Sequence, residues 1–501
     1  MKKIGSLFLS LLMVISLLAG CANGQTASPS SVAASSSMMQ PDAQDETAQT
    51  QAPKHIFYFI GDGMGLSHRQ LAEVFARYKT GDENHVLTMN AMPVTTNITT
   101  HNSNTLVTDS AAAGTAMATG QKTQTGVIGM NEDGTETYKS ISEALREKGM
   151  GIGLITTVSI THATPAAFGA HTANRNDEAA IAEQYLANEW DFLAGGGFNY
   201  FADTTEGGKR EEGDSLLDDF ENAGYTIDLD LESFTQTDFS AVEKYLGLYE
   251  PKYLTEVITQ RNGTKVSPEL SEIVQAGIDV LGQNEEGFFM MVEGGYIDGA
   301  SHNNDTAATL HEVLAFEEAV QVAVDFYNQY PEDTLILVTA DHETGGLSLG
   351  YNAYTLDLER LDTIKVAYER EIDVFLQAGD VDGYRAAMQQ HYGIEVSDED
   401  MEKILTGIEN FDITGLLADA GFTDPAIVAE YEGMRHMLGI SGHISSYLLA
   451  EETRIGWGSQ THTSEPVPLT VLGVEGERFA TCRDNTDIPK TLAEIMGVAI
   501  G

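Results

Sequence analysis

The chain has 501 residues, 42% of them hydrophobic, and a formal net charge of -49 from 27 basic and 76 acidic residues. This hydrophobic content suffices for a large buried core. The negative charge excludes a nucleic-acid-binding protein of the basic-patch kind, because such proteins attract polyanions through clustered lysine and arginine. If the chain binds an anion, metal ions or a buried arginine must supply the local positive charge.

Residues 1–20 have the features of a signal peptide. Lys2 and Lys3 precede the apolar run IGSLFLSLLMVISLL, and the tetrapeptide LAGC then ends at Cys21. This tetrapeptide resembles the lipobox of bacterial lipoproteins, which predicts cleavage before Cys21 and lipidation of that residue. The alternative is an ordinary secretory signal with a cysteine after it by chance. We expect an extracytoplasmic protein, anchored by its lipid to a bacterial membrane at the cell surface or in the periplasm.

Residues 22–52 are rich in Ser, Ala, Gln and Thr and hold almost no large apolar residues. This composition predicts a flexible tether, so that the segment 21–52 joins the lipidated cysteine to the folded part at 53–501. Cys482 has no disulfide partner in the chain if Cys21 carries lipid. We expect Cys482 to be an inert core thiol.

Short apolar runs predict the strands of a buried sheet. They are KHIFYFI (54–60), GIGLITT (151–157), GFFMMVE (287–293), TLILVTA (334–340) and VPLTVLG (467–473). Helical patterns lie between several of these runs. One helix is expected to start at Ser267-Pro268 and to place four apolar residues on one face, namely Leu270, Ile273, Val274 and Leu281. The alternation predicts an α/β fold with a large, mostly parallel central sheet flanked by helices.

Residues 351–455 differ from the rest of the folded part, since they are acidic, helical in pattern and free of short apolar strand runs. The stretch from Ser397 to Asp400 is typical of a capping box. Apolar residues follow it at helical spacing, namely Met401, Ile404, Leu405 and Ile408. We interpret 351–455 as a helical insertion within the folded part.

Polar side chains follow four of the predicted strands, at the sheet edge where ligands bind in α/β folds. They are Asp62 after the first run, His162 and Thr164 after the second, Glu293 and Asp298 at the third, and Asp341 and His342 after the fourth. Singly, such an aspartate is commonly a helix cap and such a histidine a core residue. Together, these oxygen donors and imidazoles favour zinc and magnesium sites.

Asp298 and His302 are four residues apart, which places them on one face if a helical turn follows the third strand. Two ligands of one metal ion require this arrangement, although such pairs also occur on exposed helix surfaces.

From Lys54 to the C-terminus the chain resembles the alkaline phosphatase family. The resemblance rests on long motifs in the family's order: FIGDGMG, VTDSAAAGTAMATG, THATPAAFGAHTANRN, LAGGGFNYF, FFMMVEGGYIDGASHNND, VTADHETGG, GSQTHTSEPVPL and DNTDI. The tether and much of the insertion lie outside it. The resemblance implies one alkaline-phosphatase-like catalytic domain that hydrolyses phosphate monoesters outside the cytoplasm. Family members are commonly dimers, so a homodimer is one assembly that it allows.

The resemblance also implies how the reaction proceeds. Ser110 matches the family nucleophile, which forms a phosphoserine that water then hydrolyses. Arg175 matches the guanidinium that binds two phosphate oxygens. In the family this serine begins a helix, where unpaired amides favour an anion, and the small residues after Ser110 leave room for the phosphate. A second interpretation is a buried alanine-rich helix with Ser110 as its N-cap, and both interpretations can be true together.

Two Zn²⁺ and one Mg²⁺ are the cofactors that the resemblance implies. The ligands of one zinc would be Asp298, His302 and His462. Those of the second zinc would be Asp62, Asp341 and His342. The magnesium ligands would be Asp62, Thr164 and Glu293.

Two positions differ from many family members. His162 stands where some members have an aspartate beside the magnesium site, so it would lie next to the ligands. Gly299 stands where many members place a lysine, histidine or tryptophan that helps to bind the phosphate. His101 and His171 match no family role and are expected to be structural.

Two other functions remain open from the sequence. Relatives in the wider superfamily cleave phosphodiesters or sulfate esters, although Arg175 favours monoesters. The third reading is an inactive surface lipoprotein that binds phosphate or a partner through the insertion.

Overall fold

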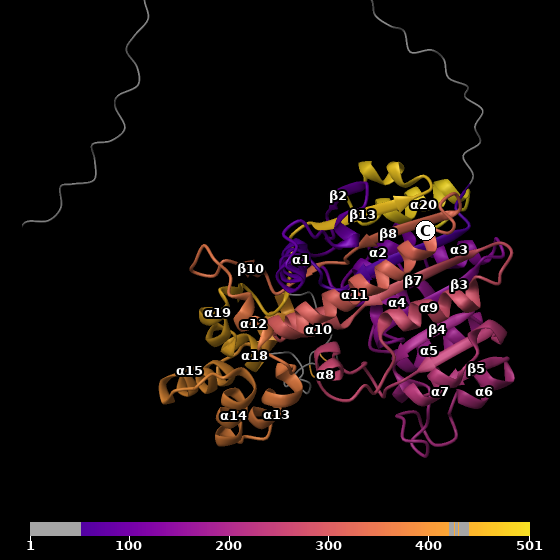
Figure 1. Cartoon of the computed structure of the whole chain (residues 1–501). Coiled ribbons are helices and arrows are strands. Elements are labelled where there is room, and N and C mark those ends of the chain that lie inside the picture. The colour runs from indigo at the N-terminus through magenta and orange to yellow at the C-terminus, as the bar shows by residue number, and fades with distance from the viewer. Residues whose placement is uncertain (1–51, 420–424, 426–428, 430–439) are drawn as a thin grey trace, which may run out of the picture. The chain divides into compact units, whose positions relative to one another are not determined.

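Nine strands form one sheet in the order β2-β13-β8-β1-β7-β3-β4-β6-β5 (Figure 1). The structure, a computed structural model, describes residues 52–419, 425, 429 and 440–501. The signal peptide expected at 1–20 lies outside the described residues, and so does all of the expected segment 21–52 except its last residue.

Seven strands of the sheet pair in parallel. They are β1 (His55–Gly61), β3 (Gly151–Ser159), β4 (Phe192–Gly196), β5 (Tyr225–Asp228), β6 (Lys244–Leu248), β7 (Phe288–Gly294) and β8 (Thr334–Thr339). β13 (Val467–Gly473) runs antiparallel to both of its neighbours, β8 and β2 (Val94–Ile98). All five predicted runs therefore form strands, and the prediction of a large, mostly parallel sheet is confirmed.

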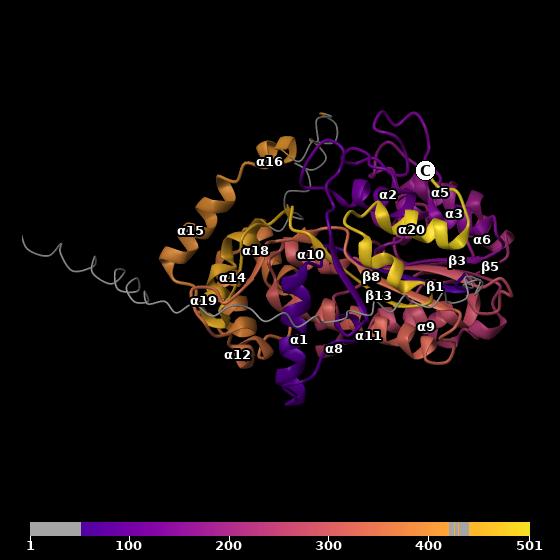
Figure 2. The same ribbon diagram turned by 90° about the horizontal axis from the view of Figure 1, so that it is seen from above.

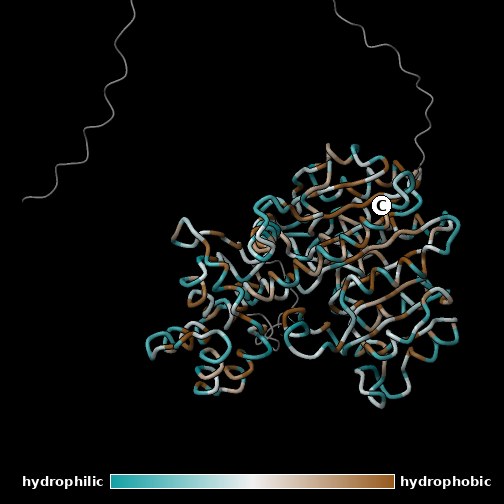
Figure 3. Tube along the Cα trace, in the orientation of Figure 1, coloured by the Kyte–Doolittle hydropathy of each residue, from teal (hydrophilic) through white to brown (hydrophobic). Residues whose placement is uncertain are grey.

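Helices cover both faces of the sheet (Figure 2). One face carries α2 (Ser110–Thr119), α3 (Ile141–Arg146), α4 (Ala163–Gly169), α5 (Glu178–Asn188) and α20 (Asp487–Met496), and the other carries α9 (Leu270–Leu281) and α11 (Thr306–Tyr327). With both faces covered, the central strands can be apolar throughout, and Figure 3 shows the sheet as mainly hydrophobic. This is why continuous apolar runs identified them.

The remaining elements outside the insertion are short, apart from one helix. The helices are α1 (Leu66–Thr80), α6 (Leu217–Asn222), α7 (Leu231–Gln236), α8 (Val257–Asn262) and α10 (Tyr296–His302). Turns of 3-10 helix lie at Thr88–Asn90, Phe198–Tyr200, Phe239–Ala241 and Gly476–Thr481. None of the helices in the described part of the chain is long and apolar enough to cross a membrane.

The helix expected from Ser267-Pro268 begins later, at Leu270. Glu269 is its N-cap and forms a reciprocal capping box with Glu272, which sets the boundary two residues beyond the proline. The predicted apolar face is buried as expected, because it packs against α11 and the sheet.

The described part of 351–455 is helical. Its elements are α12 (Leu358–Asp362), α13 (Val374–Gln377), α14 (Val381–Ala387), α15 (Asp398–Glu409), α16 (Ile413–Asp419), α18 (Ile440–Ser445) and α19 (Tyr447–Thr453), with π-helical turns at Glu369–Asp373 and Met388–Tyr392. Ser397 caps α15 by accepting a hydrogen bond from the amide of Asp400 at 3.1 Å. Figures 1 and 2 show these helices grouped near α1 and α10.

The segment is closed at its base by a two-stranded ribbon. β10 (Leu347–Leu349) pairs antiparallel with β11 (Ile455–Trp457), so the chain leaves and re-enters the main body at adjacent points. This geometry is typical of an insertion, since the inserted residues do not interrupt the sheet.

Replacing Leu337 with alanine should destabilise the protein by about 2–5 kcal/mol, because it leaves a cavity in the middle of the sheet. Leu337 lies on β8 and is fully buried. Leu229→Ala is the matched control, since that leucine is 39% exposed and should change stability little. Thermal unfolding at one scan rate compares the two, and equal losses would contradict the expected packing.

Candidate functional site

The predicted strand-end residues meet at one edge of the sheet. β8, β1, β7 and β3 are consecutive neighbours, and their carboxyl ends carry the predicted groups. The fully buried ones are Asp62, Thr164, Glu293, Asp341 and His342. Four adjacent parallel strands therefore hold these side chains at fixed positions.

Three overlapping groups of side chains lie close enough to hold metal ions. In each group the potential ligand atoms are within 4.8 Å of one another. The groups are Asp298, His342 and His462; Asp62, Asp341 and His342; and Asp62, His162 and Glu293. The second group is the ligand set that the family resemblance implied for one zinc.

The first group differs from the expected one, because it contains His342 in place of His302. The His342 and His462 rings stack with centroids 3.5 Å apart, so His342 lies between the two groups. His302 is nevertheless adjacent, with its Nε2 atom 3.2 Å from Asp298 Oδ2 and 3.2 Å from His462 Nε2. The structure thus brings all the expected ligands of both zinc sites together.

Backbone carbonyls orient two of these histidines. His302 Nδ1 donates to the carbonyl of Gln460 at 2.6 Å, and His462 Nδ1 donates to that of Thr108 at 2.8 Å. A carbonyl only accepts, so Nδ1 carries the hydrogen in both rings and Nε2 is the nitrogen that faces the site.

Thr344 orients the third histidine, a role that sequence reasoning missed. It lies on β9 (Glu343–Thr344), which pairs antiparallel with β12 (His462–Thr463). Its hydroxyl donates to Asp298 Oδ1 at 2.5 Å and lies 3.2 Å from His342 Nδ1. Thr344 therefore links a residue of each zinc group.

Gly63 is required by this close packing. Its φ is +71°, and a Cβ there would stand 2.7 Å from the Thr344 hydroxyl. Its amide donates to Asp341 Oδ1 at 3.1 Å. The glycine after Asp62 thus lets the backbone approach Thr344 and Asp341. The motif FIGDGMG contains this glycine, but the sequence alone does not show which residues it approaches.

Ser110 is the first residue of α2 and not its N-cap, so the N-cap role in the alternative interpretation is wrong, whereas the buried alanine-rich helix that it expected is present. The N-cap is Asp109, whose side chain accepts from the amide of Ala112 at 3.1 Å. Ser110 Oγ lies 3.3 Å from His342 Nε2. The helix N-terminus and the strand-end groups therefore converge on this hydroxyl.

The small residues of α2 allow it to pack closely on α4. All ten residues of α2 are buried. A Cβ added at Gly114 would lie 3.1 Å from the Ala167 Cβ and 3.4 Å from the Thr164 Cα. The alanine-rich sequence therefore serves the approach of two helices that carry Ser110 and Thr164.

Arg175 is held from two sides. Its Nη1 donates to Asp109 Oδ2 at 3.1 Å, and its Nη2 donates to His162 Nε2 at 3.2 Å. Burial and the guanidinium charge lower the pKa of His162 to about 3, so this imidazole is neutral and accepts. Asp109 is a second residue whose role sequence reasoning missed, and its position directly before Ser110 was the available signal.

The buried carboxylates fit cations. Burial raises the pKa of Asp341 to about 8, that of Glu293 to about 7, and that of Asp62 well above its usual range. Both oxygens of Asp62, Asp341 Oδ2 and Glu293 Oε1 make no hydrogen bond within the described part of the chain. Uncompensated buried charge is costly, so this donor set of carboxylates and imidazoles suits zinc and magnesium.

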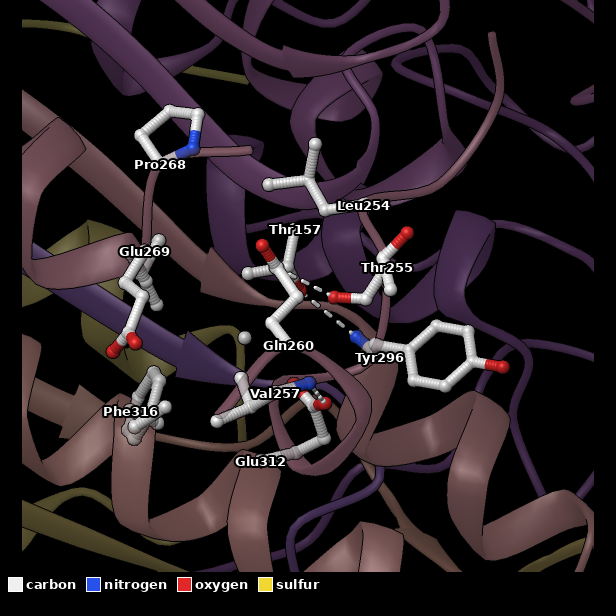
Figure 4. A pocket seen from close by; sticks show the side chains of 13 residues that line it. Thr157, Leu254, Thr255, Val257, Gln260, Pro268, Glu269, Tyr296, Glu312 and Phe316 are labelled. Carbon is white, nitrogen blue, oxygen red and sulfur yellow. Dashed lines mark hydrogen bonds between the residues drawn. The ribbon is translucent and has the colours of Figure 1, made fainter. Parts of the chain in front are cut away.

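A cavity near the site is lined by none of the predicted site residues. It lies between α8, α9 and α11 and is lined among others by Gln260, Glu312 and Phe316 (Figure 4). In its lining, the amide of Tyr296 donates to the hydroxyl of Thr157 at 3.0 Å. The cavity therefore reaches the start of α10 but lies apart from the predicted ligands.

His171, His101 and Cys482, which were expected to be structural, lie outside the three groups of potential metal ligands. His171 bonds to the Gly129 carbonyl at 2.8 Å and to Glu143 at 3.1 Å, and His101 lies 3.6 Å from Asp484. Cys482 is a free, buried thiol, as predicted.

Buried oxygen and imidazole donors beside a serine and an arginine are typical of a metal-dependent enzyme of phosphoryl transfer, since cations and a guanidinium suit the charge of that reaction.

Comparison with known proteins gives the family. A family model of alkaline phosphatases matches residues 53–498. The chain is 32% identical over 496 residues to alkaline phosphatase 3 of Bacillus subtilis (strain 168), covering 96% of both chains. Its fold matches Thermus thermophilus alkaline phosphatase with a TM-score of 0.76 at 28% identity, covering 92% of this chain and 96% of that one. Its fold also matches the cold-active alkaline phosphatase of Shewanella sp. with a TM-score of 0.70 at 27% identity, covering 88% of this chain and 99% of that one.

The chain therefore belongs to the alkaline phosphatase family. It is a phosphatase enzyme, and phosphate monoester hydrolysis is the activity that family and fold support. The family is metal-dependent, in agreement with the buried donor groups.

The raised pKa values make the stability of the metal-stripped protein depend on pH. A carboxyl group whose pKa is higher in the folded protein stabilises the fold while it is protonated. For Glu293 and Asp341 this stabilisation is complete at a pH below about 4, the pKa of such carboxyl groups in the unfolded chain. It is lost as the pH rises through their folded pKa values of about 7 for Glu293 and about 8 for Asp341. We expect the metal-stripped protein to unfold more easily at about pH 9 than at about pH 6.

Urea denaturation in the presence of a chelator measures this difference. Glu293→Gln is the control, because its neutral side chain should flatten part of the pH dependence. Equal or greater stability of the metal-stripped parent at the higher pH would contradict the expected burial of charge.

Proposed function

We propose that this protein hydrolyses phosphate monoesters through a phosphoserine intermediate on Ser110, with two Zn²⁺ and one Mg²⁺. The observation that carries the proposal is the position of Ser110 Oγ, 3.3 Å from His342 Nε2 at the start of α2. A hydroxyl placed among buried metal-type ligands and beside a guanidinium has the surroundings that a phosphoryl acceptor needs.

The donor groups suggest which residues hold the ions. Asp298, His302 and His462 would hold one zinc, and Asp62, Asp341 and His342 the other. Asp62, Thr164 and Glu293 would hold magnesium, with His162 close enough to take part, since it lies in one group with Asp62 and Glu293. When bound, such ions supply positive charge that stabilises the entering and leaving oxygens of the displacement.

The protein's own residues bind and orient the phosphoryl group. Arg175, fixed by Asp109, presents a planar fork that suits two terminal oxygens of a monoester. The positive end of the α2 dipole at its N-terminus favours the same anion. Ser110 Oγ then forms a bond to phosphorus while the ester oxygen leaves as the alcohol, and water later cleaves the phosphoserine to release phosphate.

The other functions left open by the sequence are less well supported. A phosphodiester carries one charge fewer than a monoester, so the partly buried fork of Arg175 favours monoesters. An inactive binding lipoprotein does not agree with membership of an enzyme family. The homodimer that the resemblance allows stays a prediction.

Ser110→Ala should lower the hydrolysis of 4-nitrophenyl phosphate by roughly a thousandfold or more, because the covalent step loses its nucleophile. Metal-dependent activity of the parent, abolished by a chelator, is the reference. Radiolabelled phosphate should remain on the parent after acid quenching and be absent from the variant.

Ser240→Ala is the matched control, since it removes a hydroxyl whose bond is to Asp238, outside the site. Parallel assays with bis(4-nitrophenyl) phosphate separate the two esterase activities. A zinc- and magnesium-loaded, folded parent that cleaves only the diester would refute the monoesterase proposal.

We further propose that the protein is a lipoprotein outside the cytoplasm, anchored through Cys21. The support is the LAGC tetrapeptide after a basic and apolar leader. Radiolabelled palmitate should label the expressed parent but not Cys21→Ser, and the variant should accumulate with its leader uncut. Equal labelling of both proteins would contradict this anchor.

A further inference from the structure

Three consecutive residues after His302 are buried against the helical insertion. Asn303, Asn304 and Asp305 form the turn between α10 and α11 and are at most 6% exposed. Each bonds to a different residue of 351–455, two of them neighbours in the chain. The contacts are Asn303 Nδ2 to Glu369 Oε2 at 3.0 Å, His443 Nδ1 to Asn304 Oδ1 at 2.7 Å, and the Tyr368 amide to Asp305 Oδ2 at 2.6 Å.

Asn304 links the turn directly to the site. Its amide nitrogen donates to the carbonyls of Ser301 at 2.8 Å and Ser459 at 2.9 Å. Ser301 precedes His302, and Ser459 precedes Gln460, whose carbonyl accepts from His302 Nδ1. One side chain thus connects the backbone beside His302 with the backbone that orients its ring.

The insertion completes the bonding of Asn304. Since the amide nitrogen is used by two carbonyls, Oδ1 is the acceptor and His443 Nδ1 must donate to it. Asn304 has a φ of +49°, a strained conformation that depends on its surroundings. His443 on α18 is therefore part of what holds this residue in place.

The backbone of α18 comes equally close to the turn. A Cβ added at Gly442 would lie 2.2 Å from the carbonyl oxygen of Asn303. Only glycine allows this approach, so the contact between α18 and the turn is built into the sequence of the insertion.

The insertion also contacts the other end of α10. Glu369 Oε2, which accepts from Asn303, accepts from the hydroxyl of Tyr296 at 2.8 Å. Tyr296 is the first residue of α10 and Asn303 follows its last. A single carboxylate therefore bridges both ends of the helix that carries Asp298 and His302.

We propose that the helical insertion is a positioning element for the metal ligands of α10, and that Glu369 and His443 are its positioning residues. The proposal rests on the proposed function, in which Asp298 and His302 hold zinc. Neither positioning residue touches the ligand atoms, so they act by fixing the two ends of a seven-residue helix. Metal affinity depends on such outer partners, because they keep the ligands in the geometry that the ion needs.

Two matched pairs of variants test the proposal in the full chain. His443→Asn keeps a donor near the Nδ1 position, whereas His443→Leu has nearly the same size and no donor. Glu369→Gln keeps an acceptor, whereas Glu369→Met does not. The first member of each pair should behave like the parent, and the second should lose metal more readily.

The measurement is the rate at which zinc-loaded protein releases zinc to a chelator that changes colour on binding. We expect His443→Leu and Glu369→Met to release one equivalent roughly tenfold faster than their partners. The KM for 4-nitrophenyl phosphate at saturating zinc should stay close to that of the parent. This pattern of weaker zinc retention with an unchanged KM would not arise from general loosening.

Tyr447→Phe is the control for a structural effect within the insertion. It removes the hydrogen bond from the Tyr447 hydroxyl to Asp400, 2.8 Å long, which does not involve the turn after α10. Thermal unfolding of the metal-stripped variants shows whether each still folds. The control should release zinc at the parent rate.

Equal zinc release within both matched pairs would overturn the positioning role. So would faster release from Tyr447→Phe, because zinc loss would then report the insertion's stability alone. If His302→Ala retains as much zinc as the parent, the zinc site itself is wrong. That result identifies a failure of the proposed function and refutes the positioning of its ligands with it.

Discussion

Buried negative charge is the constraint on which the rest of this structure depends. Four carboxylates lie close together, namely the fully buried ones of Asp62, Glu293 and Asp341 and the partly exposed one of Asp298. Burying such groups together is costly unless positive charge compensates them. The family's dependence on metals and the raised pKa values of three of the four point to the same requirement. The fold must therefore hold mutually repelling groups in place.

Two kinds of support hold them. The carboxylates of β1, β7 and β8 follow directly from the sheet, since neighbouring parallel strands end at one edge and their backbones are fixed by mutual hydrogen bonds. The groups outside the sheet need separate support. His302 and His462 are oriented by backbone carbonyls, Thr344 links Asp298 with His342, and the insertion contacts both ends of α10.

The same architecture explains how an enzyme with a net charge of -49 can bind a phosphate ester. Attraction must be local, and our proposal assigns it to the start of α2 together with Arg175. Asp109 caps this helix and also bonds to Arg175, so one carboxylate aligns the two groups that favour an anion. Burial keeps these interactions strong, because little water screens them.

Local patterns in the sequence determined the apolar strands and the polar residues at their ends, since both follow from burial on two faces and from the polarity of a sheet edge. The family motifs likewise indicated the serine and the arginine. Only the tertiary structure decided that β13 runs antiparallel, that Asp109 and Thr344 support the site, and that His342 lies between two groups. These features depend on contacts between residues far apart in the chain, which no local periodicity encodes. The role of Asn304 also depends on such contacts, because its hydrogen-bond partners, Ser301, Ser459 and His443, come from three separate parts of the chain.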